Sequence, residues 1–243
     1  DTEGATLTLT PNDVALYNYY IANNGSNVRV AAGEKITQYQ AMQGVLLASS
    51  NNLADSLPIC AFGSLEAYRA YATELLKTFG LTQTTIGTDA SGLSPTTTST
   101  ADDLAIIGLR AMEDPIIAKI IASSQATIPV AGTIYNTNKL LRYDDIVGVK
   151  TGETVEAGGV FILGGVREFD GKDYPIAVAV MGAELGSIAQ RDSYTLYEST
   201  KGQLVYQMIA SKGQKVGIYR TPWNDQEYLV TASKDLVVPR LLS

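Results

Sequence analysis

The sequence contains no histidine and only one cysteine, Cys60, among its 243 residues. Without an imidazole, the chain cannot carry a Ser-His-Asp triad or most kinds of zinc site. A single cysteine cannot form a disulfide within the chain or a cysteine-ligated metal cluster. Any proton transfer by the side chains of this chain must therefore use groups other than histidine.

Basic residues and long apolar runs are also scarce. Eighteen Lys and Arg against 25 Asp and Glu give a formal net charge of −7, which is the wrong sign for a nucleic-acid binder. No apolar run is long enough to span a membrane. The hydrophobic content of 45% and charged content of 18% are typical of a globular chain with a sizeable core. The chain opens at Asp1 without a leader sequence, so we expect a processed or truncated start.

The hydrophobic pattern predicts helices in the middle of the chain and strands towards both ends. Capping residues and helical spacing predict helices over residues 38–48, 65–79, 101–112, 116–122 and 187–210. Alternating or continuously apolar segments predict strands over residues 5–10, 126–130, 147–151, 160–166, 176–181 and 227–232. Pro11-Asn12-Asp13 is interpreted as the break that ends the first strand. This arrangement favours an α+β or α/β fold whose sheet is assembled from distant segments.

The tripeptide Lys150-Thr151-Gly152, at the end of a predicted strand, suits a ligand carboxylate. Lysine supplies positive charge, threonine supplies a hydroxyl donor, and glycine lets an extended ligand lie beside the strand. An edge-strand lysine before a turn explains the same residues, so the tripeptide alone is a hypothesis.

A second candidate is Ser49-Ser50-Asn51, between two predicted helices. A reactive serine without histidine needs another proton acceptor, and a lysine held neutral by burial can serve. Helix capping and turn chemistry explain the segment equally well.

The two motifs are stronger evidence for a catalytic site together than either is alone. Ser-x-x-Lys, a Ser-Asp-Asn-type element and Lys-Thr-Gly form the signature of β-lactamases and penicillin-binding proteins, and two of the three occur here in that order, about 100 residues apart. Longer runs around them, Gly44 to Asn52, Asp89 to Leu104 and Asn136 to Gly158, extend the likeness. The sequence therefore resembles the serine D-alanyl-D-alanine carboxypeptidases, the low-molecular-mass penicillin-binding proteins, over about residues 25–205.

This resemblance implies an α+β fold of the β-lactamase/DD-peptidase type, with an antiparallel sheet packed against a helical cluster. Residues 1–210 would form the penicillin-binding domain, and residues 211–243 the start of a small C-terminal β domain. The implied function is hydrolysis of D-Ala-D-Ala in peptidoglycan stem peptides through an acyl-enzyme, with β-lactams as inhibitors. Neither a metal nor a cofactor is implied. The substrate places the protein outside the cytoplasm, with any membrane anchor in segments that this chain does not include.

The resemblance also implies roles for three catalytic residues. Ser49 would relay a proton between the leaving amine and the lysines, and Lys150 would hold Ser49 and supply positive potential. Asn51 would hydrogen-bond the peptide group of the substrate.

Four further residues would bind substrate. Thr151 and Gly152 would receive the terminal carboxylate and the extended peptide, and the backbone N–H of Glu153 would be one oxyanion donor. The Glu153 carboxylate would weaken carboxylate binding unless its side chain points away. Arg191 occupies the place where the family carries an arginine that assists carboxylate recognition, although a surface arginine on a helix is nearly as good an explanation.

The family nucleophile is missing from the chain. No serine is followed by lysine three residues later, and in relatives the Ser-x-x-Lys helix precedes the strand that corresponds to residues 5–10. We expect this segment upstream of Asp1, disordered or as a separate cleaved chain, or else another molecule covering the apolar surface that it would leave. The chain alone is expected to be inactive. Two alternatives remain open, a non-catalytic peptidoglycan-binding homologue and a class A-like β-lactamase.

Overall fold

The computed structural model describes residues 3–242 and divides the chain into two compact units. The first unit ends at Tyr197 and the second begins at Glu198. The domain boundary at residue 210 stays a prediction, but the helix expected over residues 187–210 is shorter than predicted. Helix α7 spans Gly186–Ser199, and a turn containing Gly202, at φ +70°, leads into strand β8, Leu204–Ala210.

The centre of the first unit is a three-stranded antiparallel sheet. Its strands are β5 (Ile146–Thr154), β6 (Gly158–Phe169) and β7 (Lys172–Ala183), in the order β5-β6-β7. β5 therefore lies at an edge of this sheet, with one side of its backbone unpaired by the other two strands.

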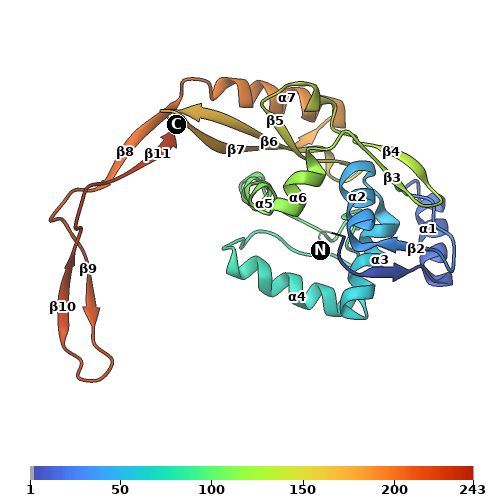
Figure 1. Cartoon of the computed structure of the whole chain (residues 1–243), viewed down its shortest axis with the longest axis horizontal. Helices are drawn as coiled ribbons and strands as arrows, with labels where there is room; N and C mark the ends of the chain where they lie inside the picture. Colours follow the sequence, from blue (N-terminus) through green and yellow to red (C-terminus); the bar gives the residue numbers. More distant parts are fainter. Residues whose placement is uncertain (1–2, 243) are drawn as a thin grey trace. The chain divides into compact units, whose positions relative to one another are not determined.

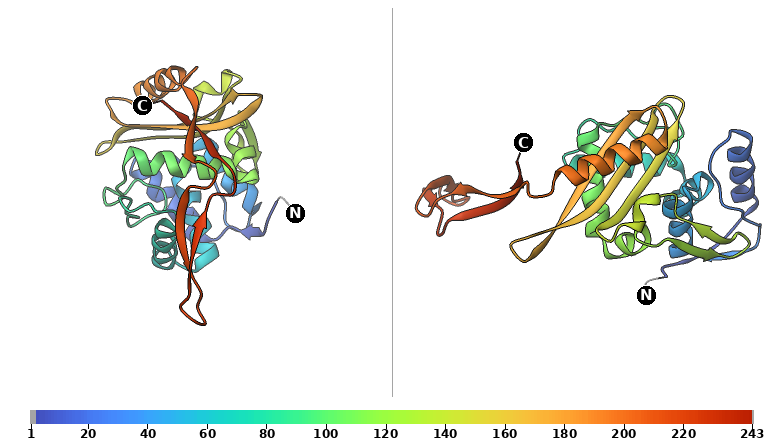
Figure 2. Two further views of the ribbon diagram at one scale, coloured as in Figure 1. Left: turned by 90° about the vertical axis from the view of Figure 1, so that its left-hand side faces the viewer. Right: turned by 90° about the horizontal axis from the view of Figure 1, so that it is seen from above.

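Helices cover both faces of the sheet, as its continuously apolar strands predict. α7 lies on one face, where Ala189 and Tyr197 join Phe161 and Leu163 in a buried cluster. α5 (Ala101–Glu113) lies on the other, where Gly108 approaches Ile162 so closely that an added Cβ would be 2.6 Å from it. The resulting helix–sheet–helix layering is visible in Figure 2.

A helical cluster packs beside this sheet and forms a second core. Its helices are α1 (Pro11–Ala22), α2 (Gln38–Ala48), α3 (Asn51–Phe62), α4 (Leu65–Thr78) and α6 (Pro115–Ile121). Two ribbons accompany them, β1 (Thr6–Thr8) with β2 (Lys35–Thr37) and β3 (Gln125–Ile128) with β4 (Gly132–Tyr135), followed by the 3₁₀ helix η1 (Lys139–Arg142). Leu47, Leu53 and Ile120 are fully buried in this second core. Figure 1 labels the helices and ribbons of the cluster.

The second unit contains two antiparallel ribbons. β8 pairs with β11 (Leu236–Leu241), and β9 (Lys215–Arg220) pairs with β10 (Glu227–Thr231). The protein therefore has the predicted α+β fold with a small C-terminal β part. Within residues 3–242, no helix has the length and apolar character needed to cross a membrane.

Candidate active site

Ser49 occupies the junction between α2 and α3. It ends α2 in the left-handed region, at φ 59° and ψ 37°, which is uncommon for a residue other than glycine. Its neighbour Ser50 caps α3, accepting a hydrogen bond from Leu53 N at 3.3 Å and donating one to Asn52 Oδ1 at 2.8 Å. The two serines therefore have different surroundings. Ser50 is a buried helix cap, whereas Ser49 lines the adjacent cleft.

Lys150 reaches Ser49 from the edge strand β5. Its Nζ donates hydrogen bonds to Ser49 Oγ at 2.7 Å and to Thr151 O at 2.7 Å. The expected convergence of Ser49 and Lys150 is therefore present. Because burial removes water from the ammonium, the pKa of Lys150 falls to about 8. Near that pH a large share of this lysine is neutral, so it can accept or return a proton through Ser49.

Thr151 and Gly152 follow on the same edge strand. Thr151 Oγ1 lies 2.7 Å from Thr137 Oγ1, and the Thr137 hydroxyl also lies 3.3 Å from Leu47 O. An extended ligand can add to the outer edge of β5 alongside Gly152, in the manner of a further strand.

The remaining three predicted site residues, Asn51, Glu153 and Arg191, lie in three different settings. Asn51 lines the cleft from the first turn of α3, and its backbone N–H donates to Ser26 O at 2.8 Å. The Glu153 carboxylate accepts a hydrogen bond from Gly186 N at 2.8 Å, at the N-terminus of α7, where the helix dipole offsets its charge. Arg191 does not line the cleft. Its side chain is 70% exposed and forms an ion pair with Asp192 at 2.9 Å.

Together these elements enclose a cleft of about 430 Å³. The cleft is also lined by residues to which the sequence analysis assigned no role. They lie in loop 91–93, in or just before η1, and in α7, and include Ser91, Thr137, Lys139 and Gln190. Thr137 and Lys139 belong to the run that carries the family likeness, so the signal was present, but nothing in that run indicates which of its side chains turn towards Lys150.

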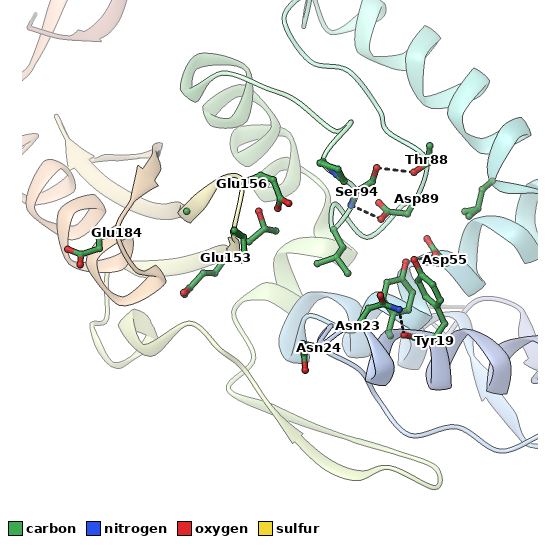
Figure 3. A pocket seen from close by; sticks show the side chains of 17 residues that line it. Tyr19, Asn23, Asn24, Asp55, Thr88, Asp89, Ser94, Glu153, Glu156 and Glu184 are labelled. Atoms are coloured by element: carbon green, nitrogen blue, oxygen red, sulfur yellow. Dashed lines mark hydrogen bonds between the residues drawn. The ribbon is translucent and has the colours of Figure 1, made fainter.

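A larger cavity of about 930 Å³ adjoins the cleft and shares Asn24, Leu93, Glu153 and Thr154 with it. Its lining contains no Lys or Arg but five carboxylates, those of Asp55, Asp89, Glu153, Glu156 and Glu184. Figure 3 shows Asp55 and Asp89 on one side of the cavity and Glu153 and Glu156 on the other.

A buried hydrogen-bond network lies beside this cavity and joins α1 and α3 to loop 89–93. Tyr20 on α1 donates its hydroxyl proton to Asp55 Oδ2 at 2.6 Å, and the other carboxylate oxygen of Asp55 accepts from Ala90 N at 2.8 Å. Tyr20 also lies 3.3 Å from Ser91 Oγ. The network thereby fixes loop 89–93, which forms one edge of the cleft.

Three kinds of comparison identify relatives of this chain. The family model described as D-alanyl-D-alanine carboxypeptidase matches residues 6–185. The D-alanyl-D-alanine carboxypeptidase DacB2 of Mycobacterium tuberculosis is 34% identical over 147 residues, which cover 58% of this chain and 50% of the relative. The chain thus spans about half the length of this curated relative.

Solved structures share the fold. Penicillin binding protein 5 from Haemophilus influenzae matches with a TM-score of 0.77 at 19% identity, covering 98% of this chain and 68% of that one. A D-alanyl-D-alanine carboxypeptidase from Mycobacterium tuberculosis H37Rv matches with a TM-score of 0.65 at 28% identity, covering 81% and 74%. These neighbours have the β-lactamase-like fold that the sequence predicted for this chain.

Proposed function

Because the chain belongs to the D-alanyl-D-alanine carboxypeptidase family, we propose that the protein is a serine-type hydrolase that removes the terminal D-alanine from peptidoglycan stem peptides outside the cytoplasm. The observation that carries this proposal is the 2.7 Å hydrogen bond between Lys150 Nζ and Ser49 Oγ beside Thr151. It is the proton-transfer pair that a serine enzyme without histidine needs.

The proposed reaction is acyl transfer in two steps. The hydroxyl of a Ser-x-x-Lys serine attacks the carbonyl of the penultimate D-alanine and gives its proton to the lysine of that motif. Lys150 passes a proton through Ser49 to the leaving amine as the peptide bond to the terminal D-alanine breaks. Water then hydrolyses the ester, returning one proton to Lys150, while the lysine of the motif returns its proton to the serine oxygen. The pKa of Lys150, about 8, suits a group that both gives and takes a proton near neutral pH.

Three more residues position the substrate in this proposal. Asn51 hydrogen-bonds the peptide group, and the Thr151 hydroxyl donates to the terminal carboxylate. The Glu153 N–H points to the developing oxyanion, a position in which a donor typically contributes about 3–4 kcal/mol to transition-state stabilisation. The Glu153 carboxylate does not oppose this role, since Gly186 N holds it at the start of α7.

The nucleophile lies outside these 243 residues in our proposal, since no Ser-x-x-Lys occurs among them. The same polypeptide or a separately cleaved chain would supply it. Residues 1–243 alone would then neither release D-alanine nor be acylated by β-lactams.

Labelling with a fluorescent penicillin tests the proposal. Residues 1–243 should not label, whereas the protein that includes the Ser-x-x-Lys segment should label stably. Lys150→Met in that longer protein should abolish labelling, while Lys119→Met, at an exposed position of α6 that does not line the cleft, should leave it unchanged. Failure of the longer protein to label would favour a non-catalytic peptidoglycan-binding homologue, and rapid turnover of the drug would favour a β-lactamase.

A further inference from the structure

The cleft carries a cation that the proposed mechanism does not use. Of the residues lining the cleft, only Lys139 and Lys150 are basic. Lys150 Nζ already donates to Ser49 and Thr151. The ammonium of Lys139 forms no ion pair or hydrogen bond with any residue of the described part of the chain, 3–242.

The backbone of Lys139 is held in a defined place. Lys139 begins η1, and its N–H donates to Gln190 Oε1 at 3.1 Å, which ties the start of η1 to α7. Two residues earlier, the Thr137 hydroxyl contacts the Thr151 hydroxyl at 2.7 Å. The segment that presents the Lys139 side chain is therefore anchored both to α7 and to the proposed carboxylate donor.

Arg191, the cation expected from the sequence, is placed differently. Its guanidinium is paired with the adjacent Asp192 and lies outside the cleft lining. Recruiting Arg191 would require breaking that pair, whereas Lys139 is one of the residues that line the cleft and its ammonium has no partner to give up.

The charged residues around the cleft and the neighbouring cavity are unevenly distributed. Five carboxylates and no basic side chains line the neighbouring cavity, so a substrate carboxylate is repelled from that side and attracted to the side of Lys139 and Lys150. We propose that Lys139 is a substrate-binding residue that pairs with the C-terminal carboxylate of the peptide while Thr151 donates to it, in place of Arg191. The inference rests on the proposed carboxypeptidase function.

The test uses the full-length protein that includes the nucleophile segment. D-Alanine release from Nα,Nε-diacetyl-L-Lys-D-Ala-D-Ala is measured for Lys139→Gln and Lys139→Arg, for Arg191→Gln as the rival candidate and, as the matched control, for Lys119→Gln, an exposed lysine outside the cleft lining. Loss of a charged hydrogen-bond donor should raise KM about tenfold in Lys139→Gln, with kcat within about twofold of the unsubstituted protein. Lys139→Arg should restore most of the affinity, and Arg191→Gln and Lys119→Gln should leave both constants unchanged.

Salt dependence supplies a second readout. The KM of the unsubstituted protein should rise with ionic strength because salt screens an exposed cation, whereas Lys139→Gln should respond much less. An unchanged KM in Lys139→Gln, or a loss of affinity in Arg191→Gln instead, would refute this inference and leave the proposed function intact. If the unsubstituted protein releases no D-alanine, the proposed function fails and this inference with it.

Discussion

The buried hydrogen bond between Tyr20 and Asp55 supports a specific prediction. Tyr20 is 1% exposed and Asp55 is 3% exposed, and the hydroxyl donates at 2.6 Å to one carboxylate oxygen. Tyr20→Phe keeps nearly all of the ring packing but removes one of the two donors to a buried carboxylate; the other is Ala90 N. Because a hydrogen bond to a charged group contributes about 1.5–3 kcal/mol, we expect the free energy of unfolding to fall by about 2 kcal/mol.

The same substitution should act in a pH-dependent way. Burial raises the pKa of Asp55, and the hydrogen bond from Tyr20 works against that rise. When the pKa of a carboxyl group is higher in the folded than in the unfolded protein, the free energy of unfolding falls as the pH rises from the lower of these pKa values to the higher. Tyr20→Phe widens this interval, so its cost should be full above the folded pKa of Asp55, where the carboxylate is ionised, and should shrink as the pH falls through that pKa.

Urea unfolding of the protein, followed by far-UV circular dichroism at neutral and acid pH, measures both effects. Hydrogen exchange at the Ala90 amide reports the local loosening of the loop that Asp55 holds. Tyr19→Phe is the matched control, because Tyr19 adjoins Tyr20 but is 58% exposed, and it should cost less than about 0.5 kcal/mol. Equal costs for the two variants, or a Tyr20→Phe cost that grows towards acid pH, would refute the reasoning.

Three further predictions concern the site and the sheet. The pKa of Lys150 is about 8 in the folded protein and higher in the unfolded chain, so above pH 8 the folded protein binds fewer protons at this lysine. The free energy of unfolding, measured in urea, should therefore rise from about pH 8 to pH 10, and Lys150→Met should abolish this rise. Ser49→Gly suits the left-handed backbone, so the unfolding midpoint should be kept while D-alanine release by the full-length protein falls about 100-fold or more; a large loss of stability would instead indicate a structural hydroxyl. Gly165→Ala would put a Cβ 2.4 Å from Tyr197 Cζ and should cost about 2 kcal/mol or more in thermal unfolding, whereas Gly217→Ala, with no atom within 4 Å, should cost far less; similar costs would contradict the close packing of α7 on the sheet.

Local hydrogen bonding explains which elements the sequence predicts well. The capping box of Thr37 and Gln40 begins α2 as expected, and the helix ends at Ala48. Ser64 likewise caps α4. In each case the signal and the structure it specifies lie within a few residues, so the tertiary environment has little to add.

The elements that sequence reasoning missed have ambiguous local signals. Strand β1 ends before Pro11, as predicted, but Pro11-Asn12-Asp13 is also the first turn of α1, which was not predicted, with Thr10 as the N-cap and Asp13 completing a capping box. Proline suits the first turn of a helix as well as it suits a turn. The apolar residues of β8 are as compatible with a continuation of α7 as with a strand. They form a strand because they pair with β11.

The residue types of the site were determined by the sequence alone. Without histidine, a serine needs lysine as its proton partner, and the order of Ser49-Ser50-Asn51 and Lys150-Thr151-Gly152 identified the family. Only the tertiary structure decided which of these side chains meet. Ser49 and Lys150 are 101 residues apart, and their contact depends on how α2 packs beside the edge strand β5. The same packing places Lys139 among the residues that line the cleft and leaves Arg191, paired with Asp192, outside that lining, because the placement of a side chain follows from the placement of its backbone and not from its distance along the chain.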